Sequence, residues 1–170
     1  GLAEREETLG DGVTALLRLW VVTLVLNLVG GALFVFVLSV DGALPRGTVH
    51  SLETFARETV HRSALAEFAK AITGGALVTL MSYTLSAVDS IGGRLTIAYL
   101  VGFLLALGPF SHVIVTTLHV LFGVAFTDSI GISELVVTTG SIAAGNVVGG
   151  IGLVTLSHVA QVKGAGRSRE

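Results

Sequence analysis

Long apolar segments alternate with short polar segments along the chain. The four apolar segments cover residues 15–40, 68–88, 95–126 and 134–162. An α-helix of about 20 apolar residues crosses the hydrocarbon core of a bilayer, so each segment is long enough to span a membrane. The pattern predicts an all-α, polytopic membrane protein.

The third apolar segment is too long for one straight span. Residues 95–126 contain no Asp, Glu, Lys or Arg, so they form either a strongly tilted helix or an interrupted one. Gly108-Pro109 lies near the middle, and proline removes a helical hydrogen bond and clashes with the preceding turn. We therefore expect a broken helix, with His112 directly after the break.

Polar segments lie at both ends of the chain and between the first two spans. Residues 1–14 form a polar, acidic-rich N-terminal segment, 41–67 a polar loop with a short amphipathic helix, and 163–170 a basic tail. Four spans place both ends of the chain on the same side of the membrane. Lys and Arg are more numerous on that side, which predicts cytoplasmic termini.

The composition excludes several functional classes. Only 13% of the residues are charged, whereas a soluble domain carries about 25%. The net charge of -2 provides no basic surface for nucleic acid. Cysteine is absent, so the chain has neither disulfides nor a thiolate metal site.

Two spans share a short pattern. Residues 27–31 read NLVGG in the first span, and residues 146–150 read NVVGG in the last. These spans run in opposite directions across the membrane, as repeats of inverted topology do. The alternative is chance similarity between two segments rich in glycine and valine. We expect the buried amide of Asn27 to form a hydrogen bond to a neighbouring helix.

Three motifs in a fixed order resemble the formate/nitrite transporter family, in particular its divergent bacterial branch. They are GGALVTL (74–80), GPFSHVIVTTLHVLFGV (108–124) and GNVVGG (145–150). The resemblance implies an aquaporin-like inverted-repeat helical bundle with a broken pore helix, assembled as a homo-pentamer in the bacterial inner membrane. The chain would cover family helices three to six, and the first two helices would be missing from it.

The resemblance also implies the roles of individual residues. The expected substrate pathway comprises His112, Ser111, Thr116, Asn146, Thr79 and Gly75; the expected pore constriction comprises Leu105 and Val78; and the expected vestibule cations are Arg62 and Lys70.

Four positions depart from the family pattern. Ser111 replaces an acidic residue before the histidine, Thr116 and Gly75 replace asparagines, and Thr59 occupies the position of a lysine before family helix four. Arg62 and Lys70 are the nearby cations that could take over from that lysine.

His112 is the residue on which the functional hypothesis depends. An imidazole within a bilayer is costly and usually marks a pathway or a proton site, and its charge responds to small changes near neutral pH. The free N–H groups at a helix break attract anions. His112 would therefore attract a small monovalent anion and share a proton with it. The alternative is a packed histidine bonded to a neighbouring helix.

The other histidines are expected to have no part in the mechanism. His119 follows His112 by two helical turns and is expected to be a packing or interfacial residue. His158 is expected to be interfacial, and His50 and His61 are expected to be solvated in the polar loop.

We expect a channel or transporter for a small monovalent anion of the formate, nitrite or hydrosulfide class, with transport linked to protons. The alternative is a transport-inactive assembly or regulatory protein of the same fold. A membrane metalloenzyme is disfavoured, because the five histidines show no metal-ligand spacing. We expect no enzyme activity, cofactor or metal, and the expected partners are the lipid bilayer, the anion and protons.

Overall fold

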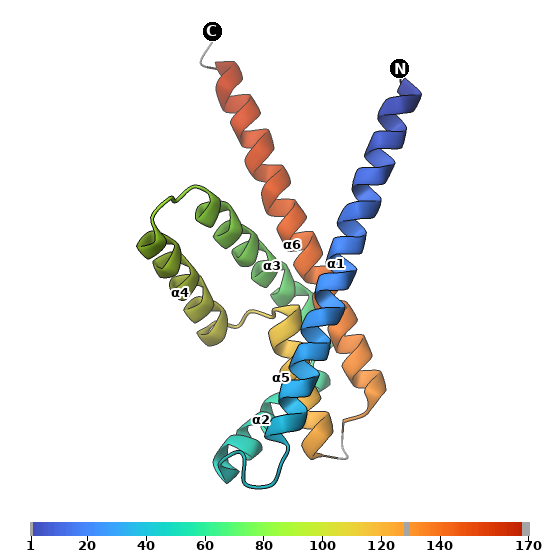
Figure 1. Cartoon of the computed structure of the whole chain (residues 1–170), viewed down its shortest axis with the longest axis vertical. Helices are drawn as coiled ribbons and strands as arrows, with labels where there is room; N and C mark the ends of the chain where they lie inside the picture. Colours follow the sequence, from blue (N-terminus) through green and yellow to red (C-terminus); the bar gives the residue numbers. More distant parts are fainter. Residues whose placement is uncertain (1, 128–129, 168–170) are drawn as a thin grey trace.

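The computed structural model describes residues 2–127 and 130–167, and the secondary structure of this part of the chain is entirely helical (Figure 1). Its elements are α1 (Leu2–Leu38), α2 (Arg46–His61), α3 (Ala64–Ser86), α4 (Ile91–Leu107), α5 (Val113–Phe126) and α6 (Ile132–Arg167). The all-α prediction is confirmed.

Among the described residues, three helices are long and apolar enough to cross a membrane. The candidate spans are Gly10–Leu38 in α1, Ala64–Ser86 in α3 and Ile132–Gln161 in α6. The third apolar segment forms two shorter apolar helices, α4 and α5, which are separated by residues 108–112. The helix break expected at Gly108-Pro109 is therefore present.

Several helices extend beyond the apolar segments that predict them. α1 begins at Leu2, so the polar N-terminal segment and the first span form one helix, and α6 continues into the basic tail as far as Arg167. α4 begins at Ile91, before the apolar segment 95–126 that predicts it, because the Ser90 hydroxyl accepts a hydrogen bond from the Gly93 N–H (3.1 Å).

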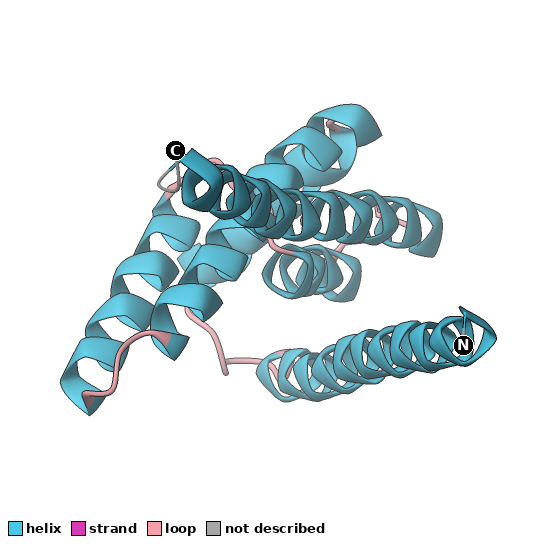
Figure 2. Cartoon of the chain, turned by 90° about the horizontal axis from the view of Figure 1, so that it is seen from above, coloured by secondary structure: helices cyan, strands magenta, loops and turns pink. Residues whose placement is uncertain are grey.

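The most extensive helix contact joins α3 and α6, which run beside each other through the centre of the molecule (Figure 1). α2 packs on α5, α4 returns along α3, and α1 contacts α5. Viewed from above, α1 lies at the side of the bundle (Figure 2). α1 and α6 run in opposite directions, so the start of α1 and the end of α6 lie at the same end of the molecule (Figure 1).

Glycines allow α3 and α6 to approach closely. A Cβ atom at Gly145 would collide with the carbonyl of Phe68, and one at Gly149 with the carbonyl of Ile72. On α3, Gly75 faces the backbone of Asn146 in the same way. Small residues that bring backbones together are typical of membrane helix interfaces, and here they place Asn146 against α3.

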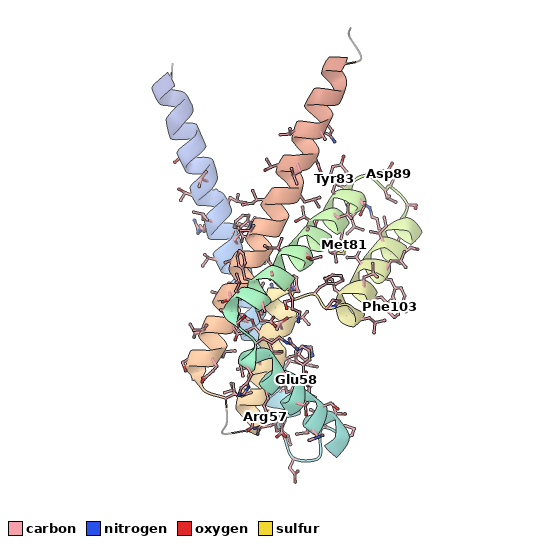
Figure 3. The ribbon with its side chains drawn as sticks, turned by 180° about the vertical axis from the view of Figure 1, so that it is seen from behind. Arg57, Glu58, Met81, Tyr83, Asp89 and Phe103 are labelled. Atoms are coloured by element: carbon pink, nitrogen blue, oxygen red, sulfur yellow. The ribbon has the colours of Figure 1, made fainter. Side chains whose placement is uncertain are left out.

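The amphipathic helix expected within residues 41–67 is α2, and it packs against α5. Its residue Ala56 is fully buried together with Val120 of α5 and Ile130, and Val60 packs against this cluster. α2 is therefore part of the folded bundle at the end that carries Arg57 and Glu58, opposite the α3–α4 turn near Tyr83 and Asp89 (Figure 3).

Candidate functional site: the helix interruption

The interruption between α4 and α5 begins at a Gly-Pro pair. The Gly108 N–H donates the last hydrogen bond of α4 to the Leu104 carbonyl (2.8 Å), and Pro109 has no N–H with which to continue the helix. The Phe110 ring folds over Gly108, where a Cβ atom would collide with it. The chain then runs in extended conformation to His112, the N-cap of α5 (φ -107°, ψ 128°).

Asn146 of α6 closes the gap that the interruption leaves in the hydrogen bonding. Its Nδ2 donates to the carbonyls of Ser111 (2.9 Å) and Ala71 (2.8 Å), and its Oδ1 accepts from the Val113 N–H (2.9 Å). The Ser111 carbonyl and the Val113 N–H are backbone groups that a broken helix leaves without partners. One side-chain amide thus joins α3, the interruption and α6.

Ser111 is held by α3 as well as by Asn146. Its hydroxyl donates to Glu67 Oε2 (2.7 Å), and its N–H lies 3.5 Å from the Lys70 carbonyl. Gly74 leaves room for the Ser111 carbonyl, which a Cβ atom at that position would strike. Ser111 itself is 2% exposed, so the residue before His112 is buried as well as held through its hydroxyl and its backbone.

Glu67 connects the interruption to the predicted vestibule cations. Its carboxylate is buried, with Oε1 accepting from Arg62 Nη1 (2.9 Å) and lying 3.6 Å from Lys70 Nζ. Arg62 also lies 3.8 Å from the exposed Glu58 carboxylate. Arg62 and Glu67 line a cavity of about 260 Å³ between α3 and the start of α6, which Glu134 also borders.

Glu67 is not among the site residues predicted from the sequence. It is an acidic residue near the start of an apolar helix, where a carboxylate is commonly solvated and favoured by the helix dipole. Its partner Ser111 lies 44 positions further along the chain, and no local pattern joins the two. A charged residue inside a membrane-length helix is the one available signal, because such residues usually have a partner.

His112 lies half-buried as the N-cap of α5, directly before the helix restarts at Val113. Its backbone carbonyl accepts from the Thr116 N–H (2.9 Å), which begins α5. Its Nδ1 is buried, and no group among the described residues lies within hydrogen-bonding distance. The imidazole therefore stands at the N-terminus of α5 with a buried ring nitrogen that has no hydrogen-bond partner among the described residues.

The other predicted site residues lie at various depths around this point. Thr116 is buried one turn into α5, while Thr79 and the expected constriction residues Val78 and Leu105 are half-buried. Gly75 packs against the Asn146 backbone. The structure thus brings together Ser111, His112, Asn146 and Gly75, and Glu67 connects them to Arg62 and Lys70.

Three histidines lie away from the interruption. His119 lies two turns after His112 on α5, and the centroid of its ring is 4.7 Å from that of Phe55. This contact agrees with a packing role. His50 and His61 are exposed on α2. The side chain of His158 lies outside the described residues.

The prediction that Asn27 forms a hydrogen bond to a neighbouring helix is wrong for the described residues. Its Nδ2 donates to the Thr23 carbonyl of its own helix (2.8 Å), and the residue is exposed. The physical reason is that α1 contacts mainly α5, through a different face on which Gly31 meets Leu118.

Comparison with known protein families gives one match. The sequence model described as formate/nitrite transporter matches residues 3–160, which include all of the interruption and its partners. Searches of curated proteins and of solved structures found no match. The family match covers most of the chain. The chain therefore belongs to the formate/nitrite transporter family, whose members are multi-pass membrane channels and transporters for small anions and are not enzymes.

Proposed function

We propose that this protein conducts a small monovalent anion of the formate, nitrite or hydrosulfide class, and that the flux is linked to protons through His112. The observation that carries the proposal is the helix interruption at residues 108–112, held by Asn146. At this interruption the His112 Nδ1 lies at the N-terminus of α5 and has no hydrogen-bond partner among the described residues. Because these hydrogen bonds hold its backbone, the interruption is a defined part of the folded bundle.

The chemistry of the interruption suits a weak-acid anion. The N–H groups in the first turn of a helix have no intrahelical partners and carry partial positive charge, so an anion is favoured beside His112. An anion that takes a proton there becomes a neutral acid. The neutral acid crosses the low-dielectric part of the path without the large cost of an unpaired buried charge.

The surrounding residues have roles in the same proposal. Arg62 and Lys70 raise the local anion concentration at the entrance, and Leu105 and Val78 form an apolar constriction that excludes hydrated ions. Hydroxyl groups of Thr79 and Thr116 offer hydrogen bonds to the anion between these points.

The assembly belongs to the proposal as well. We place the protein in the bacterial inner membrane as a homo-pentamer with cytoplasmic termini, and we assign α1 and α6 to two different repeats. The NxVGG pattern in α1 and in α6, which run in opposite directions, supports an inverted repeat.

Replacement of His112 tests the mechanism. In proteoliposomes of the intact protein, His112→Ala should abolish anion uptake driven by a pH gradient, because the proton donor is lost. The control is His50→Ala, which removes an exposed histidine of α2 and should leave uptake within about twofold of the native rate. Native uptake rates in His112→Ala would contradict the mechanism.

A second candidate function is a transport-inactive assembly or regulatory protein of the same fold. The observation that favours it is the pairing of both vestibule cations with Glu67, which offsets their attraction for anions. This candidate predicts that the intact native protein moves no weak-acid anion across liposomes at any pH. Any such flux with a pH dependence excludes it.

A further inference from the structure

The carboxylate of Glu67 is the only acidic group among the described residues for which the structure gives a hydrogen bond to the interruption. It is 1% exposed and belongs to the first turns of α3. Its two oxygens have different partners: Oε2 binds the Ser111 hydroxyl, and Oε1 binds Arg62 and lies near Lys70. The same group therefore faces the interruption on one side and the cavity beside Arg62 on the other.

The bond to Glu67 completes the attachment of Ser111. The Ser111 carbonyl is held by Asn146, its N–H lies toward the Lys70 carbonyl, and its hydroxyl is held by Glu67. Because His112 follows directly, the direction in which its ring leaves the backbone depends on how Ser111 is fixed. His112 receives no hydrogen bond at Nδ1 from the described residues, so no bond at that nitrogen fixes the ring.

The bond between Ser111 and Glu67 has the geometry of a hydrogen bond to a charged acceptor. A hydrogen bond to a charged acceptor is shorter and about twice as strong as a neutral one, and the 2.7 Å distance between Ser111 Oγ and Glu67 Oε2 fits that class. A buried carboxylate is tolerated only when it is paired, and Arg62 and Lys70 provide the pairing. A neutral side chain here would weaken the hold on Ser111 and leave both cations without this partner.

We propose that Glu67 is a positioning residue of the permeation path, which fixes Ser111 and thereby orients His112 at the interruption. The inference rests on the proposed function, because it explains how the path is kept in working geometry. Glu67 does not contact the anion in this mechanism. It acts through Ser111, and its charge is matched by the two cations.

The test combines two readouts on the intact protein. Anion uptake in proteoliposomes gives the maximum rate and the half-saturation concentration of formate. Hydrogen–deuterium exchange in nanodiscs, followed by mass spectrometry, reports how firmly the backbone of residues 108–116 is held. Glu67→Gln keeps the size and removes the charge, Ser111→Ala removes only the hydroxyl, and Glu58→Gln is the matched control because Glu58 faces the same Arg62 from an exposed position.

Glu67→Gln and Ser111→Ala should each lower the maximum uptake rate about tenfold, with the half-saturation concentration changed less than about threefold. Both should speed exchange of residues 108–116. Glu58→Gln should leave both readouts within about twofold of native. If Glu67→Gln behaves like Glu58→Gln in both readouts, the proposal is overturned.

Moving the carboxylate from position 67 to position 111 distinguishes a role in positioning His112 from a general role in the stability of the fold. Glu67→Ala vacates the space beside Ser111 Oγ, and Ser111→Glu sends a carboxylate from the interruption toward Arg62 and Lys70. The double variant Glu67→Ala/Ser111→Glu should recover uptake to within about threefold of native, while Glu67→Ala alone stays at least about tenfold below it. Failure of the double variant to exceed the single one contradicts the proposal.

The two readouts also separate this inference from the proposed function. If the native protein shows no uptake of any weak-acid anion, the proposed function fails. Exchange of residues 108–116 still reports whether Glu67 holds the interruption: unchanged exchange in Glu67→Gln and in Ser111→Ala overturns that part, and faster exchange in both supports it.

Discussion

The NxVGG pattern occurs on two helices of this protein, and the two copies have very different surroundings. On α6, Asn146 makes three hydrogen bonds to backbone groups of α3 and the interruption, and Gly149 lies against the Ile72 carbonyl. On α1, Asn27 bonds to its own helix, and a Cβ atom added at Gly30 would meet no described atom within 4 Å. On α6 the pattern packs against the backbone of α3. On α1, Asn27 and Gly30 have no such contact among the described residues, and Gly31 meets the Leu118 side chain of α5.

The contrast shows where each residue of the pattern is useful. The asparagine is useful where a neighbouring helix is interrupted, because the break leaves backbone groups such as the Ser111 carbonyl and the Val113 N–H free to bind its amide. The glycine is useful where another backbone comes close. Among the described residues, neither condition holds for Asn27 and Gly30 of α1.

Of the substitutions that compare α6 with α1, Asn146→Leu is expected to change the free energy of unfolding most. Leucine has a similar size but no polar groups, so two carbonyls and one N–H lose their partner. The free energy of unfolding should fall by about 2–3 kcal/mol. Thermal unfolding in detergent, followed by circular dichroism, would show the change.

Asn27→Leu is the matched control. It removes only a hydrogen bond within α1, so the free energy of unfolding of this chain should change by less than about 0.5 kcal/mol. Equal destabilisation by the two variants would mean that the two copies of the pattern are equivalent, and the contrast between α6 and α1 would be wrong.

Alanine substitutions at Gly149 and Gly30 are expected to change the free energy of unfolding less, and in different directions in the two helices. Gly149→Ala pushes a methyl group into the Ile72 carbonyl and should destabilise the fold by about 1–2 kcal/mol. Gly30→Ala adds a methyl group in open space and removes a flexible glycine from a helix, so it should be neutral or stabilise by up to about 1 kcal/mol. The same unfolding measurement compares them, and a destabilising Gly30→Ala would indicate that α1 has a close neighbour.

Local signals in the sequence are enough to predict the helices and the break. Uncharged length predicts the spans, and Gly108-Pro109 predicts the interruption because proline acts on its own backbone and the preceding turn. The ends of the helices are less predictable. α4 starts at Ile91 because of one hydroxyl group on Ser90, and apolar length alone places its start later.

The environment of the interruption could not be predicted in the same way, because it depends on residues far apart in the chain. The sequence at position 111 indicates the loss of an acidic residue, yet the structure supplies a carboxylate there from Glu67 on α3. Gly75 lies against the backbone of Asn146, a contact that no local pattern in the sequence indicates. Both outcomes follow from the close approach of α3 and α6, which periodicity does not specify.

Proton transfer through His112 can be examined by measuring anion flux and internal pH simultaneously in proteoliposomes of the native protein. A formate gradient is applied without a pH gradient, and an entrapped dye reports the internal pH. Transfer through His112 predicts that the interior acidifies in step with formate entry and that little membrane potential develops. Formate entry that builds an interior-negative potential without acidification would show that the anion crosses unprotonated, and the proposed role of His112 would be wrong.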